Sequence, residues 1–277
     1  MAPDRYQNTL RCNSYVVFVL LVITAFLWLF LNNRYHIIGY HEEIQLFRTD
    51  IFYFTQYISK PGGLLLYLSS FLTQFYCYPW IGASILAVSI GTIYLLLVAI
   101  YAKINRAIHT LFIIPLAVNL LLLMACSYIY FSLYNILGIC IALSSFLVYL
   151  IAKGRVRYIV GILLYLLLYF TVAGNVLLFV VMVVINECFN RERSYIYIAA
   201  ISALAILTPY LASLFRYVAP LRSMYFATTP FDLPVTINEY IYAWVAIPIL
   251  YIIWFSVSKY TSAITKINIF ILLPILY

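Results

Sequence analysis

Long apolar runs separated by short basic clusters dominate this sequence. They lie at about 15–31, 81–102, 110–127, 133–152, 158–173, 174–189, 195–215, 241–258 and 267–277. Most approach the ~20 residues that a helix needs to cross a ~30 Å hydrocarbon core. The spans of a membrane barrel would alternate between apolar and polar residues, whereas these runs are continuously apolar. The pattern therefore predicts an all-α polytopic membrane protein, a single membrane domain with about eight or nine transmembrane helices.

Composition excludes a soluble fold. Hydrophobic residues make up 66% of the 277 residues and charged residues only 9%. Soluble domains contain about 45–50% apolar residues and about 25% charged residues. The net charge of +8 comes from cations placed between apolar runs, which is typical of topology signals and not of a nucleic-acid-binding face. The five cysteines show no paired or metal-ligand spacing, so no disulfide framework is expected.

The N-terminus fixes the expected orientation. Residues 1–13 are polar and include Arg5 and Arg11. The apolar run that follows is longer than the ~7–15-residue core of a signal peptide, and it ends in Asn32 without a small-residue cleavage site. We expect a retained first span with a cytoplasmic N-terminus.

The segment 62–78 could either cross the membrane or lie on its surface. A helix of this length covers only about 25 Å, which is marginal for a span. If the segment stays on the surface, the non-cytoplasmic side holds five of the sixteen cations, namely Arg34, Arg48, Lys60, Arg216 and Arg222. If it spans, most cations move outside, against the positive-inside rule. The rule favours the surface arrangement.

Two extracytoplasmic loops follow from this choice. Residues 33–80 form the first loop, which carries interfacial helices rich in aromatic residues, and residues 216–240 form the second. In the first loop Ser70, Gln74 and Cys77 predict a polar stripe on one helical face, and such a helix would roof or floor a cavity. The run 267–277 ends without a polar cap, which suggests a C-terminally truncated chain.

Three of the eight acidic residues, Glu42, Glu43 and Asp50, lie close together in the first loop. A helix over 42–54 would place Glu43 and Asp50 on one face, because seven steps of ~100° nearly close two turns. Such carboxylates could act as a general base and as ligands of a divalent cation, and His41 could join them.

A structural alternative remains for these acids. They could simply pair with Arg34, Arg48 or Lys60 on a solvated loop helix. No spacing in the sequence identifies a specific metal, so the metal stays unknown.

The second loop offers cations near the membrane surface. Arg216 and Arg222, with Tyr225 nearby, suit an anionic lipid headgroup such as a phosphate or pyrophosphate. The alternative is that the arginines snorkel from the preceding span. Within the apolar runs ionisable residues are nearly absent, and Glu187 beside Arg191 is the nearest candidate for an intramembrane charge.

The first 80 residues resemble the start of glycosyltransferases of the GT-C type. A first span precedes an acidic outer loop, and Lys60-Pro61-Gly62-Gly63-Leu64 stands where that group has a proline-rich motif, with Gly-Gly replacing the second proline. The resemblance implies a sugar donor linked to a polyprenyl phosphate, with an acid of the first outer loop as base or metal ligand. For a second-loop acid only Asp232 and Glu239 are available.

The stretch EEIQLF with PGGLLLYLSSFLTQFY, over roughly 40–85, is also similar to an uncharacterised bacterial family of multi-spanning inner-membrane proteins. Together the resemblances favour a glycosyltransferase-like protein acting on lipid-linked saccharides at the outer face of the bacterial inner membrane. In this hypothesis Glu43, Asp50 or Glu42 is catalytic, and Arg216, Arg222, Tyr225 and Gln74 bind substrate. The alternative is a non-enzymatic membrane protein, such as an exporter subunit or an assembly scaffold.

Overall fold

A computed structural model describes residues 3–33, 38–44, 47–104, 113–189, 194–217, 220–232 and 237–264. Every regular element in those ranges is helical. The apolar run 267–277 expected from the sequence lies outside the described residues. The side chains of Glu42 and Glu43 also lie outside this description, although their backbone is part of a helix.

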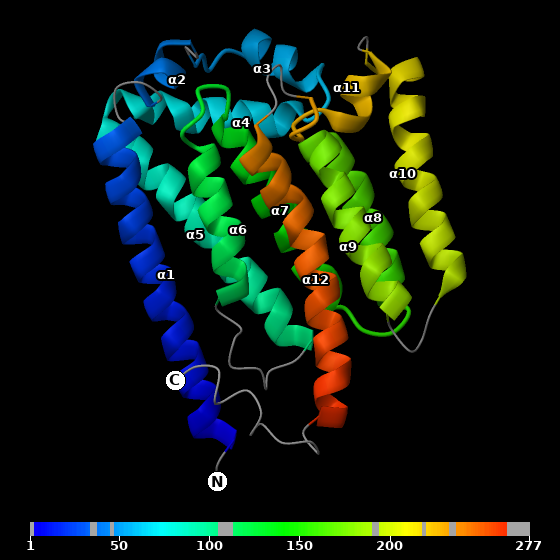
Figure 1. The fold of residues 1–277 in the computed structure, drawn as a ribbon. Coiled ribbons are helices and arrows are strands. Elements are labelled where there is room, and N and C mark those ends of the chain that lie inside the picture. Colours follow the sequence, from blue (N-terminus) through cyan, green and yellow to red (C-terminus); the bar gives the residue numbers. More distant parts are fainter. Residues whose placement is uncertain are drawn as a thin grey trace.

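In the described part of the chain, the longer helices run along the bundle (Figure 1). They are α1 (Pro3–Asn33), α5 (Pro79–Ile104), α6 (Ile113–Ala125), α7 (Leu133–Ile151), α8 (Val156–Val172), α9 (Val176–Phe189), α10 (Tyr195–Phe215) and α12 (Asn238–Ile264). Successive members of this set run in opposite directions. The short elements are α2 (Gly39–Ile44), α3 (Ile51–Ile58), α4 (Gly63–Thr73), η2 (Gln74–Cys77), η4 (Ala173–Asn175) and α11 (Leu221–Phe226).

Six helical stretches in the described chain are long and apolar enough to cross a membrane, so the membrane class expected from the sequence is confirmed. One of these stretches, Val156–Phe189, comprises α8, η4 and α9. Since α8 and α9 pack against each other, the chain reverses at η4 and does not form one continuous rod. The boundary at Ala173-Gly174-Asn175 is thus a real turn.

The core lies along α5, α7, α9 and α12. Helix α5 packs on α1, α6 and α7, while α12 packs on α6 and α9. Large aromatic side chains such as Tyr94, Tyr149 and Trp254 are almost fully buried there. Helices α1 and α10 are peripheral, because only 17% of each candidate span is buried, compared with 67% for Val156–Phe189.

The short helices gather at one end of the bundle, which we call the loop end (Figure 1). Helix α4 lies across this end and packs on α7 and α8, with α3 packed on α4. Aromatic rings of Phe47, Tyr53, Tyr57, Tyr67 and Phe71 form the α3–α4 contact, with centroid distances between 4.9 and 6.3 Å. A helix held in this way rests on the bundle and does not run through it.

Two local predictions in the first loop are wrong. Residues 42–54 do not form one helix, because α2 ends at Ile44 and α3 begins at Ile51, after Asp50 at its N-cap position with extended backbone. Glu43 therefore belongs to α2, whereas Asp50 precedes α3 and makes no side-chain capping hydrogen bond. The polar stripe is also interrupted, since α4 ends at Thr73 and Ser70 is buried against the Tyr57 hydroxyl at 3.1 Å.

Candidate functional site at the loop end

Three residues with positive φ meet at the loop end. They are Gly62 before α4 (φ 68°), Ala173 in η4 (φ 51°) and Thr228 after α11 (φ 67°). A Cβ atom on Gly62 would lie 3.0 Å from the Ala173 Cβ and 3.4 Å from the Thr228 Cγ2. The first and second loops therefore touch each other here. Left-handed backbone is rare for alanine and threonine, and such strain persists only where surrounding contacts impose it.

Hydrogen bonds around Asn175 hold this junction. Its Nδ2 donates to the Thr228 carbonyl at 2.7 Å, and its Oδ1 accepts from Trp244 Nε1 at 3.2 Å. The Thr228 hydroxyl donates to the Val172 carbonyl at 2.7 Å, and the Gly174 amide donates to the Ala227 carbonyl at 2.9 Å. Buried polar groups that are paired in this way rigidify a structure, so the second loop is fixed to the turn between α8 and α9.

The second loop carries an arginine–aspartate arrangement. Arg222 Nη2 donates to the Phe231 carbonyl at 2.9 Å, and the Ser223 hydroxyl lies 3.5 Å from Asp232 Oδ1. Burial raises the pKa of the Asp232 carboxyl, while the charge of Arg222 and the Ser223 hydrogen bond oppose the rise. The pKa of Asp232 is thus governed chiefly by burial, and the charge of Arg222, one of the predicted substrate-binding arginines, acts in the opposite direction.

The other predicted site residues are dispersed over the loop end. Asp50 forms an exposed ion pair with Arg48, with Oδ1 3.2 Å from Nε. The Arg216 guanidinium lies over the rings of Phe170 (5.1 Å) and Tyr217 (5.5 Å).

Tyr225 and Gln74 complete the predicted set. The Tyr225 hydroxyl donates to the Ile206 carbonyl at 2.7 Å, and Gln74 is half-buried at the start of η2. The predicted site residues whose side chains are described therefore all lie at the loop end. The hydrogen bond of Arg222 stays within the second loop, and that of Tyr225 reaches α10.

His41 is a loop-end residue that the sequence suggested only in passing. Its side chain is 9% exposed and hydrogen bonded to the Phe131 backbone, and among the described residues its Nε2 has no partner. Burial lowers the pKa of this imidazole, and the Phe131 hydrogen bond opposes the change. Neutral histidine with one free ring nitrogen can accept a proton or a hydrogen bond.

Glu239 is a second acid at this end. One of its carboxylate oxygens accepts a hydrogen bond from the Tyr128 hydroxyl at 2.9 Å. This contact joins the loop between α6 and α7 to the start of α12. The described part of the chain brings no three His, Cys, Asp or Glu side chains together in a way that could hold a metal ion.

The opposite end of the bundle contains a buried charge cluster, of which the sequence pointed to Glu187 but not to its partners. Glu187 is fully buried, and its Oε1 accepts hydrogen bonds from Arg157 Nη2 (2.8 Å) and the Tyr149 hydroxyl (2.7 Å). Asn186 Nδ2 lies 3.4 Å from the same oxygen. Sequence proximity pointed to Arg191, whose placement lies outside the described residues; the partner that the structure shows is Arg157.

Comparison with known families gives one clear result. The profile of a family of unknown function, DUF6057, matches residues 9–273. The chain belongs to this family. No curated protein and no solved structure shows a significant match.

The match spans almost the whole chain, so the DUF6057 family model covers the residues at both ends of the bundle. Membership of a family without a known function, which the sequence suggested, is therefore confirmed. The DUF6057 description assigns no activity, so the function of this member has to be argued from its loop end.

Proposed function

We propose that this DUF6057 member handles a lipid-linked saccharide at the outer face of a bacterial inner membrane, as a glycosyltransferase with GT-C-like architecture. The contact of Gly62 with Ala173 and Thr228 carries the proposal. This contact places the loop with the predicted acids against the loop with the predicted arginines. A site that both binds a phosphate and activates an acceptor hydroxyl needs its acids and arginines at the same end of the bundle, and the joined loops support that arrangement.

The proposal includes a topology. Eight spans, α1, α5, α6, α7, α8, α9, α10 and α12, would cross the membrane with the N-terminus in the cytoplasm and the loop end outside. The alternating directions of these helices support it. The distribution of cations supports it too, because only five of the sixteen belong to the loop-end segments of the sequence.

In the proposed chemistry a first-loop carboxylate, Glu43 or Asp50, removes the proton from an acceptor hydroxyl while Glu42 supports it. Arg222 and Arg216 neutralise the lipid phosphate that leaves. Tyr225 and Gln74 bind polar parts of the substrate. A divalent cation at this end would take oxygen ligands from the substrate phosphate as well as from carboxylates.

Sugar transfer by the purified chain from polyprenyl-phosphate donors tests this function. We expect Glu43→Gln or Asp50→Asn to lower kcat by about 100-fold or more, the scale of general-base catalysis. Arg48→Gln is the matched control, because it breaks the ion pair with Asp50 and leaves the carboxylate. Wild-type activity in both Glu43→Gln and Asp50→Asn would exclude the proposed chemistry.

A second candidate is a non-enzymatic scaffold or exporter subunit. The local pairing of Asp50 with Arg48 and of Arg222 with the Phe231 carbonyl favours it, since these charges already have partners within the protein. In that case the same carboxylate variants would leave cell-surface saccharide export unchanged. A defined partner would also co-purify with the wild-type chain, and the donor lipid would not be consumed.

A further inference from the structure

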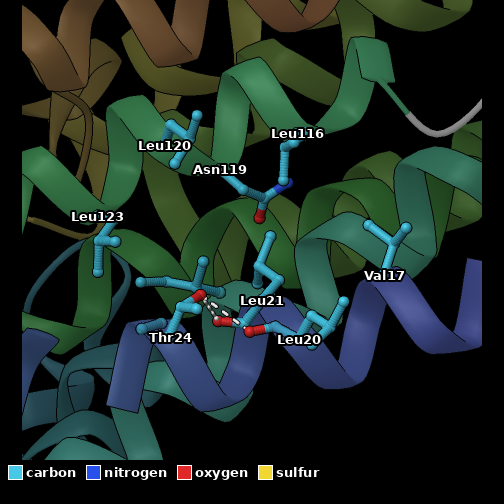
Figure 2. A pocket seen from close by; sticks show the side chains of 10 residues that line it. Val17, Leu20, Leu21, Thr24, Leu116, Asn119, Leu120 and Leu123 are labelled. Atoms are coloured by element: carbon cyan, nitrogen blue, oxygen red, sulfur yellow. Dashed lines mark hydrogen bonds between the residues drawn. The ribbon is translucent and has the colours of Figure 1, made fainter. Parts of the chain in front are cut away.

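A cavity of about 370 Å³ lies between α1, α5 and α6 (Figure 2). Leu21, Ala25, Ile90 and Asn119 form its buried floor, each 7% exposed or less. The volume falls in the ~300–1,000 Å³ range of ligand pockets. The cavity is distinct from the loop end and shares no residue with the proposed transferase site.

The cavity opens sideways, toward the lipid. Leu20 on α1 and Leu120 on α6 both line it, and they are 56% and 51% exposed. Asn119 is the central residue of α6, and Thr24 lies near the middle of the candidate span Tyr15–Asn32. A ligand would therefore enter from the bilayer, near the mid-depth of the membrane.

Asn119 gives this apolar cavity a specific polar feature. The residue is 1% exposed, and its Nδ2 donates to the Pro115 carbonyl at 2.7 Å. Its Oδ1 is buried without a hydrogen-bond partner among the described residues and points from α6 toward α1 (Figure 2). Burying a carbonyl without a hydrogen-bond partner costs free energy in hydrocarbon surroundings. A hydrogen-bond donor beside this oxygen would therefore be stabilising.

The protein side chains in the cavity do not supply that donor. Thr24 is the other polar residue of the lining, and its hydroxyl donates to the backbone of its own helix, at 2.9 Å from the Leu20 carbonyl and 3.0 Å from the Leu21 carbonyl. An enclosed water typically makes about three hydrogen bonds, and this lining offers at most two acceptors, Asn119 Oδ1 and the lone pairs of the Thr24 hydroxyl. A plain acyl chain would fill the space and leave Oδ1 unpaired. Charged groups are disfavoured at this depth.

We propose that the cavity binds a membrane alcohol drawn from the surrounding bilayer. The hydrocarbon body of the lipid packs against the leucine, isoleucine and alanine walls, and its hydroxyl donates a hydrogen bond to Asn119 Oδ1. The site selects hydroxyl-bearing lipids over lipids that offer only acyl chains at this depth, because only the former satisfy the buried carbonyl.

Photolabelling of the purified full chain in lipid nanodiscs tests the site. The probe is a hexadecanol that carries a diazirine and an alkyne, and its methyl ether, which cannot donate a hydrogen bond, is the control probe. We expect the alcohol to label peptides of α1 and α6 about five- to ten-fold more than the ether, the scale of one hydrogen bond within a membrane. In Asn119→Leu the two probes should label equally.

The comparison of the two probes on the wild-type chain does not depend on any variant folding. Equal labelling of α1 and α6 by alcohol and ether would show simple hydrocarbon filling and overturn the proposal. A preference that persists in Asn119→Leu, or labelling confined to other helices, would overturn it as well. Asn135→Leu is the matched control, since this buried asparagine of α7 does not line the cavity, and the preference should remain.

Discussion

Arg157 Nη2 lies 2.8 Å from Glu187 Oε1, and the glutamate is completely removed from solvent. The pair links the start of α8 to the end of α9, and the Tyr149 hydroxyl of α7 donates to the same oxygen at 2.7 Å. Three helices are therefore joined through one carboxylate oxygen at the end of the bundle opposite the loops.

Breaking this pair should destabilise the bundle strongly. We expect Arg157→Met to lower the free energy of unfolding by about 3–5 kcal/mol, because it leaves the fully buried Glu187 without its charge partner. Glu187→Gln should cost less, because the Arg157 side chain is 18% exposed and keeps its contacts with the rings of Tyr149 and Tyr158. Thermal unfolding in detergent would measure the loss. The double variant should recover much of it, whereas additive losses would contradict the pairing. Tyr149→Phe, which removes one donor and keeps the charges, should cost less, about 1.5–3 kcal/mol.

The contact between the two loops can be measured with a pair of glycines. Gly62 and Gly154 both have positive φ, at 68° and 59°, but only Gly62 is crowded; a Cβ on Gly154 would meet nothing within 4 Å. Both alanine variants bear backbone strain of order 1–3 kcal/mol. We expect Gly62→Ala to lose about 1–3 kcal/mol more, the usual cost of overpacking. Equal losses in thermal unfolding would mean that Gly62 does not pack against Ala173 and Thr228.

His41 should make stability depend on pH. Burial holds its pKa below the ordinary value of 6.5, so between the two values the unfolded chain binds more protons than the folded one. The stability that neutral His41 contributes is complete above pH 6.5 and is lost as the pH falls toward the folded pKa. We expect the thermal midpoint to drop as the pH falls below 6.5, and to drop less in His41→Gln.

Asp232 provides the control for this pH profile. Its pKa is raised above the ordinary 3.8, so its folded form binds more protons in the window above that value, and its contribution to stability rises as the pH falls. Asp232→Asn should therefore steepen the acid loss that His41 causes. A profile that is identical in wild type, His41→Gln and Asp232→Asn would contradict both assignments.

The sequence predicted the long helices well because apolar length decides them. The runs near 81–102, 133–152 and 195–215 correspond to α5, α7 and α10, and the turn at 173–175 separates α8 from α9. The surface helix was expected from charge counting, and α4 does lie across the end of the bundle. Its position relative to a membrane remains part of the proposal.

Local and long-range contacts were harder to anticipate. Periodicity alone allowed one helix over 42–54, but Asp50 has extended backbone just before α3 and its carboxylate pairs with Arg48. Glu187 and Arg157 are 30 positions apart in the sequence and meet only because α8 packs on α9. Sequence spacing alone could not show this packing. The junction of Gly62, Ala173 and Thr228 also depends on how distant segments pack. Of these three residues only Gly62, as a glycine in a Pro-Gly-Gly sequence, indicated a positive φ beforehand.

The location of the loop end relative to the membrane is the central claim, and accessible cysteines test it most directly. Ser59 after α3 and Lys153 between α7 and α8 are both exposed and belong to opposite ends of the bundle. Each is replaced by cysteine in a chain whose five native cysteines have been changed to serine. Intact cells are then treated with a membrane-impermeant maleimide. We expect Ser59→Cys to react and Lys153→Cys to react only after permeabilisation; the reverse pattern would place the loop end in the cytoplasm and contradict the account.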